Sequence, residues 1–195
     1  MKIKPRAQEA ERTRQVLLAT ARARFAQGGQ AAVAVLEVTA EAGLTTGALY
    51  HHFQNRQGLL QAVLEEVAQS VADRAAEAVA TKTDGWEQLR AGVDAVLDCC
   101  LEPEVRIAYN EAPAIMGLDE WRRLEESKTG VLLVAVLSQL ANDGRIKKVS
   151  LPLLAAMVKG AIVEGAMSIT RAEHPKKVRR EAGALLDALL SGLKT

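Results

Sequence analysis

The chain has 195 residues and a formal net charge of +1, with 49% hydrophobic, 25% charged and only 3% aromatic residues. This balance excludes a disordered chain, and the abundance of alanine and leucine favours a core of helices with small aliphatic contacts. No export signal is visible and no apolar run approaches the ~20 residues of a spanning helix, so we expect a soluble, cytoplasmic protein without a membrane partner.

Apolar residues recur at helical spacing along the whole chain, and no hairpin signals separate alternating runs. The pattern predicts helices over about residues 7–27, 35–42, 45–52, 57–80, 86–101, 119–142, 150–172 and 175–193, with a further segment around Tyr109 that Pro113 breaks. Gly28 and Gly29 should end the first helix, and Asn55 should cap the fourth. We therefore expect an all-α protein of about nine helices, with "TKTDG" (81–85) as its best candidate boundary.

Charge is distributed unevenly along this helical chain. Residues 1–57 contain eight Lys or Arg against four Asp or Glu, a net charge of +4, whereas the remainder carries −3. A basic head on a mildly acidic body is typical of a polyanion-binding domain attached to a second unit, although chance variation over so short a segment is the alternative.

The two helices on either side of Gly43 are too short to be stable alone and must pack on their long neighbours. This arrangement predicts a helix-turn-helix, whose second helix can enter the major groove of DNA. The hydroxyls of Thr45 and Thr46 lie at the N-terminus of that helix, where phosphate oxygens are favoured, and Gly47 permits close approach of the backbone.

Tyr50 and His51 are expected on the outward face of the same helix, within reach of phosphates. Adjacent histidines diverge on a helix, so His51 and His52 are not expected to share a metal ion. No nucleophile–base pair and no phosphate-binding glycine loop is evident, so the sequence indicates neither an enzyme nor a cofactor.

At these residues the chain resembles the tetracycline-repressor (TetR) family of bacterial transcriptional regulators. The resemblance runs through "TRQVLLATARARFAQGG" (13–29) and "AGLTTGALYHHFQNRQGLLQAV" (42–63). It implies a DNA-binding domain over residues 1–57 and an effector-binding and dimerisation domain over residues 58–195. The DNA contacts that it implies are Thr45, Thr46, Gly47, Tyr50 and His51, with Thr13, Arg14 and Arg56 on the DNA backbone.

The chain departs from the family pattern at several head positions. Family members usually carry a hydroxyl at Ala34, a polar residue at Leu36, alanine at Thr39 and lysine at Arg56, and many carry a basic residue or proline at Thr46. Leu36 and Thr46 each remove a possible charge, so we expect fewer neutralised phosphates and modest non-specific affinity for DNA.

The last two helices have apolar stripes too wide for one partner helix. They predict a two-fold dimer through a four-helix bundle, as the resemblance also implies, unless both faces are covered within the monomer. The residues predicted at this interface are Gly160, Gly165, Leu186, Leu189 and Leu190.

Bulky residues between the head and the dimer face are candidates for an apolar effector pocket, although residues of this kind more often belong to the core. The predicted set is Trp86, Cys100, Tyr109, Met116, Trp121 and Met157. Cys99 and Cys100 are expected to be buried thiols without a disulfide, with a redox sensor as the alternative.

The function predicted is a regulator that binds a palindromic operator on double-stranded DNA as a homodimer and is released by a small-molecule effector. A helical adaptor that does not read DNA is the alternative.

Overall fold

The computed structural model describes the backbone of residues 5–195 and the side chains from residue 7 onward. Lys2, Lys4 and the side chain of Arg6, which contribute to the predicted basic head, therefore lie outside the described part. The described residues form helices and one isolated bridge between Ile146 and Lys194. In chain order the elements are α1 (Pro5–Gly28), the 3-10 turn η1 (Gly29–Ala32), α2 (Val35–Glu41), α3 (Thr46–Phe53), α4 (Arg56–Ala80), α5 (Gly85–Cys99), α6 (Pro103–Met116), α7 (Leu118–Glu125), the π-helical turn η2 (Glu126–Gly130), α8 (Val131–Asn142), α9 (Leu151–Arg171) and α10 (Pro175–Ser191).

The all-α prediction is confirmed, and most helix boundaries fall within two residues of those expected. α7, η2 and α8 follow one another without a break, which accounts for the single helix predicted over residues 119–142. Pro113 is the exception: it lies inside α6 and does not break it. Because Pro113 is in the last turn, it removes one helical hydrogen bond only, and the buried side chains of Ala112 and Ile115 hold the turn in place until Gly117 ends the helix.

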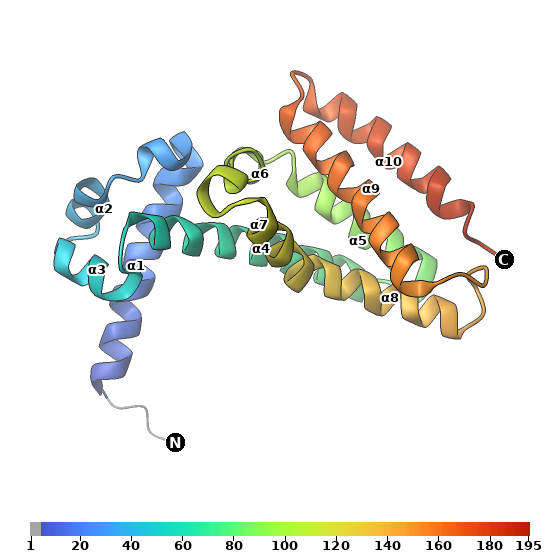
Figure 1. Cartoon of the computed structure of the whole chain (residues 1–195), viewed down its shortest axis with the longest axis horizontal. Coiled ribbons are helices and arrows are strands. Elements are labelled where there is room, and N and C mark those ends of the chain that lie inside the picture. The colour runs from blue at the N-terminus through green and yellow to red at the C-terminus, as the bar shows by residue number, and fades with distance from the viewer. Residues whose placement is uncertain (1–4) are drawn as a thin grey trace.

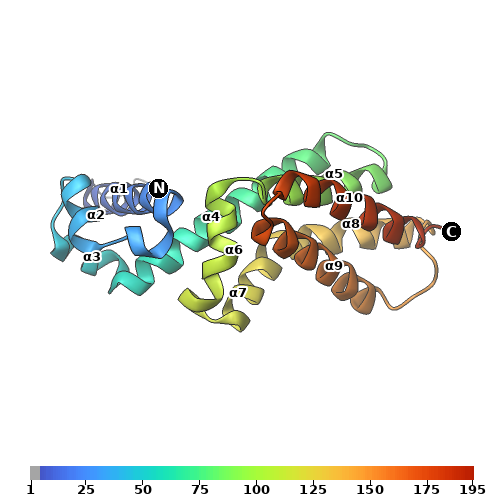
Figure 2. The ribbon, with the colours of Figure 1, turned by 90° about the horizontal axis from the view of Figure 1, so that it is seen from above.

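The molecule consists of a head and a body that α4 joins (Figure 1). α1, α2 and α3 surround the first part of α4, and α5, α8, α9 and α10 pack along and beyond the rest of it. Viewed from above, α6 crosses α4 where the head meets the body (Figure 2). α6 contacts α1 and η1 on the head side and α9 on the body side, so it is the helix best placed to connect the two parts.

The core of the head consists of side chains from all four of its helices. Leu17, Phe25, Val38, Leu49 and Leu60 are fully buried there. Since α2 and α3 have only seven and eight residues, their stability comes from this packing rather than from their own hydrogen bonds.

α9 is long and apolar enough to cross a membrane when judged by length and composition alone. Only 33% of its most apolar window is buried in the monomer. α9 packs against α5, α6, α8 and α10, as a helix of a globular bundle does, and its remaining apolar residues lie on the surface beside those of α10.

Candidate DNA-binding surface and body cavity

The turn between α2 and α3 has the geometry of a helix-turn-helix. Gly43 adopts φ 65°, a left-handed conformation that favours glycine, and a Cβ added there would meet no atom within 4 Å. The requirement for glycine is therefore conformational rather than steric. Leu49 and Phe53 of α3 are buried, as expected from their spacing, which leaves the opposite side of α3 facing outward.

The N-terminal end of α3 presents hydroxyl groups and free backbone donors to solvent. Thr45 is the N-cap, and its Oγ1 accepts a hydrogen bond from Ala48 N at 3.2 Å, so the hydroxyl proton remains available to another acceptor. Gly47 and His51 are exposed, Thr46 is half-buried and Tyr50 is 50% exposed. The five residues predicted to touch DNA thus share one end and one face of α3.

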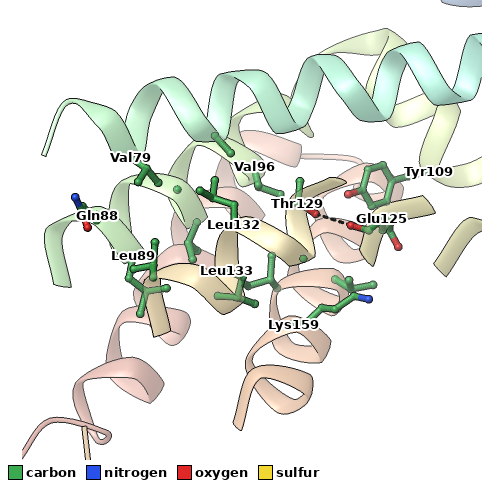
Figure 3. A pocket seen from close by; sticks show the side chains of 17 residues that line it. Val79, Gln88, Leu89, Val96, Tyr109, Glu125, Thr129, Leu132, Leu133 and Lys159 are labelled. Carbon is green, nitrogen blue, oxygen red and sulfur yellow. Dashed lines mark hydrogen bonds between the residues drawn. The ribbon is translucent and has the colours of Figure 1, made fainter. Parts of the chain in front are cut away.

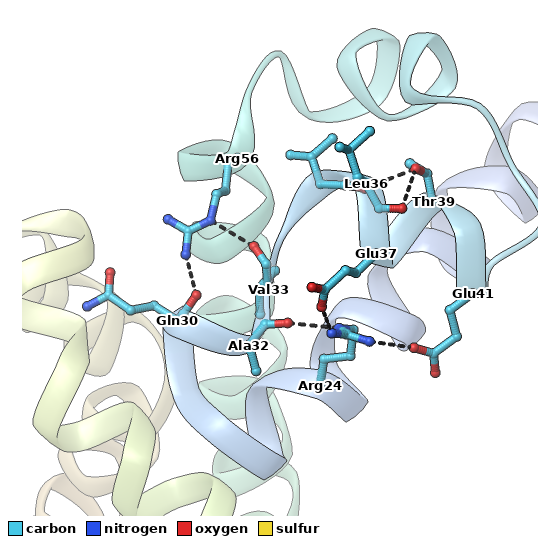
Figure 4. A network of polar contacts seen from close by, with 10 residues as sticks. Arg24, Gln30, Ala32, Val33, Leu36, Glu37, Thr39, Glu41 and Arg56 are labelled. Atoms are coloured by element: carbon cyan, nitrogen blue, oxygen red, sulfur yellow. Dashed lines mark hydrogen bonds and ion pairs between the residues drawn. The ribbon is translucent and has the colours of Figure 1, made fainter.

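Most of the arginines that the structure describes in the head are bound within the protein (Figure 4). Arg24 Nε donates to Ala32 O at 2.8 Å, and its guanidinium also pairs with Glu41 at 2.9 Å and with Glu37. Arg56, predicted to contact the DNA backbone, instead donates from Nε to Val33 O at 2.7 Å and from a second nitrogen to Gln30 O. These carbonyls lie in the turn between α1 and α2, so Arg56 holds that turn against the start of α4.

The other three described arginines of the head, Arg22, Arg14 and Arg12, have three different environments. Arg22 makes a two-point contact with Glu104 of α6, at 2.7 and 2.9 Å. The guanidinium of Arg14 lies 5.4 Å from the centre of the Phe53 ring, near Thr13, which is half-buried. Arg12, which sequence reasoning did not single out, is exposed and makes no ion pair with any side chain that the structure describes.

The start of α2 carries an apolar residue on its surface. Leu36 is 74% exposed, whereas Thr39 is buried and its hydroxyl donates to Val35 O at 3.0 Å within the helix. The exposed leucine gives this end of α2 no charge for a phosphate, which fits the modest affinity expected from the sequence.

The body contains a cavity of about 50 Å³, partly open to solvent, between α4, α5, α8 and α9 (Figure 3). Its wall is mostly valine and leucine; Tyr109, Glu125, Thr129 and Lys159 lie toward one end and Gln88 at the other. The lining residues are Ala75, Val79, Gln88, Leu89, Gly92, Val93, Val96, Tyr109, Glu125, Thr129, Gly130, Leu132, Leu133, Val136, Lys159, Ile162 and Val163.

Among the six residues predicted for an effector pocket, Tyr109 lines this cavity. Trp121 lies directly behind it, with the two rings 5.4 Å apart and edge to face. Cys100 is buried and Met116 is half-buried against the core, so both are packing residues. Trp86 is partly buried at the edge of the core, with the Lys194 amine 5.2 Å from its ring centre, and Met157 is 67% exposed.

Glu125 is the main polar feature of the cavity, and sequence reasoning missed it. Its side chain is 6% exposed, and burial raises the pKa of its carboxyl group, against the opposing effects of the Tyr109 hydroxyl and the Lys159 charge. The sequence does contain a pattern that points to Glu125: Trp121, Glu125 and Thr129 are spaced four residues apart and so share one face of the helix.

The two cysteines are free, buried thiols, as predicted. Burial raises the pKa of Cys100 to about 12 and also raises the pKa of Cys99. Neither residue is therefore a thiolate near neutral pH, which gives the redox-sensor alternative no support.

An exposed apolar face covers the outer side of α9 and α10. Its large members are Leu153, Met157, Leu185 and Leu189, and a groove of about 430 Å³ runs between the two helices. Of the residues predicted at a dimer interface, Leu189 and Gly160 lie on this exposed face, whereas Leu186 and Leu190 are buried within the monomer. Gly165 also faces inward, since a Cβ added there would contact Leu97, Ala182 and Leu186.

Comparison with known proteins connects both parts of the chain to one group of regulators. Residues 17–63 match the family described as "Bacterial regulatory proteins, tetR family", and residues 86–193 match the one described as "Tetracyclin repressor-like, C-terminal domain". A crystal structure of a TetR-family transcriptional regulator from Pectobacterium atrosepticum is 33% identical, with a TM-score of 0.85 over 98% of each chain.

Two further proteins are more distant. The transposon Tn10 TetC protein of Escherichia coli is 29% identical over 152 residues, which are 76% of this chain and 75% of that protein. The transcriptional regulator FadR from Bacillus subtilis, solved in complex with stearoyl-CoA, shares the fold with a TM-score of 0.73 at 18% identity, over 92% of this chain and 98% of that one.

Proposed function

The chain belongs to the TetR family of bacterial transcriptional regulators, and we propose that it is a cytoplasmic repressor released from a palindromic operator by a small-molecule effector. Residues 1–57 are the DNA-binding unit in this proposal, and residues 58–195 bind the effector and form the dimer. This division coincides with the first turn of α4, which begins at Arg56.

The observation that carries the proposal is the exposure of one face of α3. Thr45, Gly47, Tyr50 and His51 face solvent together, while the inward side of the same helix fills the core of the head. A solvent-exposed face that carries hydroxyl, phenol and imidazole groups at a helix N-terminus is suited to phosphates and base edges.

The operator is palindromic because the reading unit is a dimer. The outer face of α9 and α10 exposes four large apolar side chains, and pairing it with a second copy across a two-fold axis would bury them in a four-helix bundle. Two copies of α3 reach successive major grooves when the dimer holds them about 34 Å apart.

Release is driven by the helix that connects the cavity to the head. α6 places Tyr109 in the cavity and, on its other sides, Glu104 against Arg22 and Glu111 against Gln30. A ligand that displaces Tyr109 therefore acts on both head contacts. A hundredfold change in operator occupancy needs only about 2.7 kcal/mol of differential ligand affinity between the two arrangements.

The proposed effector is small because the cavity is small. The FadR structure of similar fold holds stearoyl-CoA, whereas the cavity here has a volume of about 50 Å³. A long acyl chain would require the body to be rebuilt, and a compact molecule requires only that part of the wall moves.

The test is DNA binding by the purified dimer, measured by fluorescence anisotropy on duplexes taken from upstream of its own coding sequence. Tyr50→Ala should weaken specific binding at least about tenfold, because it removes a side chain at the centre of the α3 surface. Leu118→Ala is the matched control, since Leu118 on α7 is 49% exposed and lies in the body. Sedimentation should show both variants as dimers.

Salt dependence provides the second readout. The logarithm of affinity should fall against the logarithm of salt concentration with a slope of about −0.9 per neutralised phosphate. Equal binding by wild type and Tyr50→Ala, or a flat salt dependence, would show that α3 does not lie on DNA.

A further inference from the structure

We propose that the body cavity binds a small apolar amine, whose ammonium group pairs with the Glu125 carboxylate while its hydrocarbon part lies against the valine and leucine walls. The inference deepens the proposed function and rests on it, because it names the chemical class of the effector. It is carried by the position and partners of Glu125.

Glu125 is a buried carboxylate that lines the cavity without a counter-ion of its own. It forms no ion pair with any basic side chain described by the structure, although Lys159 belongs to the same wall. The amine of Lys159 pairs instead with the neighbouring Glu126, at 3.6 Å, and Glu126 is exposed. A buried carboxylate that lacks a cation is costly to keep ionised, and a cationic ligand would supply the missing charge.

Two hydroxyl groups complete the polar end of the cavity. Tyr109 and Thr129 flank Glu125 (Figure 3), and the Thr129 hydroxyl donates to the backbone oxygen of Glu125 at 3.2 Å. Together the hydroxyl oxygens and the carboxylate offer acceptors to the several N–H bonds of an ammonium group, whereas an alcohol could use only one of them.

Apart from Gln88 at the far end, whose amide donates to Lys82 O, the rest of the wall is unsuited to strongly polar ligands (Figure 3). Leu89, Val93, Val96, Leu132, Leu133 and Val136 offer no hydrogen bond through their side chains. A carboxylate or phosphate ligand would have to place its charge next to Glu125, and a strongly polar molecule would lose its hydration along the apolar wall.

The size of the cavity limits the ligand and shows which part of the wall must move. A benzene-sized guest occupies a cavity of about 150 Å³, so any ligand beyond a few heavy atoms has to widen the present 50 Å³. The π-helical turn η2 contributes Thr129 and Gly130 to the wall and directly follows Glu125. π-helical turns are rare and frequently accompany functional sites, so this turn is the part of the wall that we expect to rearrange.

The test compares ligands that share a skeleton and differ only in the polar group. Propylamine, 1-propanol and propionate form a small set; benzylamine, benzyl alcohol and benzoate form a larger one. Calorimetric titration of the purified full chain at pH 7.5, without DNA, should give each amine at least about tenfold higher affinity than its alcohol, with no binding of the carboxylate. Glu125→Gln should abolish the preference for the amine. Glu120→Gln should preserve it, because Glu120 is exposed on the same helix and forms no ion pair with a described side chain.

Four results would overturn the proposal: no binding of either amine, binding of a carboxylate in preference to the amine, an unchanged preference in Glu125→Gln, or loss of the preference in Glu120→Gln. The head-group ranking of the wild type decides the question even if Glu125→Gln fails to fold. Because these titrations contain no DNA, they fail or succeed independently of operator binding. An amine that binds Glu125 but leaves operator affinity unchanged would support the ligand assignment and refute effector-driven release.

Discussion

The carboxylate of Glu111 accepts a hydrogen bond from the backbone nitrogen of Gln30 at 2.6 Å, across the junction between α6 and η1. The approach is this close because residue 29 is glycine: it adopts φ 62°, and a Cβ there would collide with the Glu111 carboxylate. The Arg22–Glu104 pair lies about two turns away on the same helix, so together the two contacts fix α6 to the head at two points.

We predict that Glu111→Ala weakens the attachment of the head to the body. The variant removes a charge-assisted acceptor from a half-buried backbone donor, so the free energy of unfolding should fall by about 1–3 kcal/mol. Urea denaturation measures the change. Glu77→Ala is the control, because Glu77 is exposed on α4, makes no ion pair with a described side chain, and gains the same helix propensity.

The same variant tests the connection between cavity and operator. If α6 transmits the effector signal through this contact, Glu111→Ala should also reduce the difference in operator affinity measured with and without ligand. Unchanged stability together with an unchanged ligand effect would remove Glu111 from the pathway.

The dimer face is tested by charges placed on its exposed members. Leu185 and Leu189 are both more than half exposed on α10, so the double substitution Leu185→Glu, Leu189→Glu leaves the monomer core intact and puts four carboxylates into the proposed two-fold interface. Sedimentation should show a folded monomer whose operator affinity is lower by at least about a hundredfold, since only one half-site contact remains for each molecule.

A matched control places the same charges elsewhere. Val131→Glu with Val134→Glu alters two exposed valines on α8 and should leave the dimer intact. A dimer that survived the α10 double substitution but dissociated with the α8 one would move the interface to α8.

The head could be read from the sequence because its signals are local. Thr45 and Asn55 cap the helices that follow them, as residues of their type do, and Asn55 Oδ1 accepts from Gly58 N at 2.8 Å. Gly43 marks the turn by the left-handed backbone that it alone adopts readily. Each of these signals involves residues within three or four positions of each other.

The body was harder to predict because its features depend on which helices converge. Leu186 and Leu189 belong to one apolar stripe, and spacing cannot show that α9 and α5 cover the first while the second stays exposed. Most of the predicted pocket residues do not line the cavity, which lies where smaller valines and leucines meet. Cys100, Met116 and Trp121 pack in or against the core, and Met157 stays on the surface. Arg56 was assigned to DNA by resemblance, but tertiary contacts with two carbonyls use its guanidinium.

Gln54 is a site of backbone strain between α3 and α4. Among the described residues other than glycine, Gln54 is the one whose φ is positive, at 62°. Its side chain is exposed. Gln54→Gly should relieve backbone strain in the folded state, but it also adds conformational freedom to the unfolded chain. We expect the relief of strain to be the larger effect, so the free energy of unfolding should rise by about 0.5–1 kcal/mol. Gln57→Gly, the same change inside the first turn of α4, should instead lower it, and thermal unfolding compares the two.

The pH dependence of stability tests the environment of Glu125. The groups around it are Tyr109 from α6, Cys100 just after the end of α5, Lys159 from α9 and Arg122 from its own helix. Burial raises the pKa of Glu125, so the folded protein binds its proton more tightly than the unfolded chain does. Its contribution to stability is then fully present below the unfolded pKa of about 4.3 and is lost as pH rises through the folded pKa.

Glu125→Gln removes this titration while keeping the shape of the side chain. The variant should therefore be more stable than wild type at pH 7, and its advantage should shrink toward pH 4, where the wild-type carboxyl is protonated in both states. Denaturation curves of both proteins across this range measure the difference, in which all other titrating groups cancel. Glu120→Gln is the matched control, because it makes the same change at an exposed carboxyl group of the same helix. If the stability difference between Glu125→Gln and wild type did not change with pH, the prediction would be wrong. The Glu125 carboxylate would then be as well stabilised in the folded protein as it is in water.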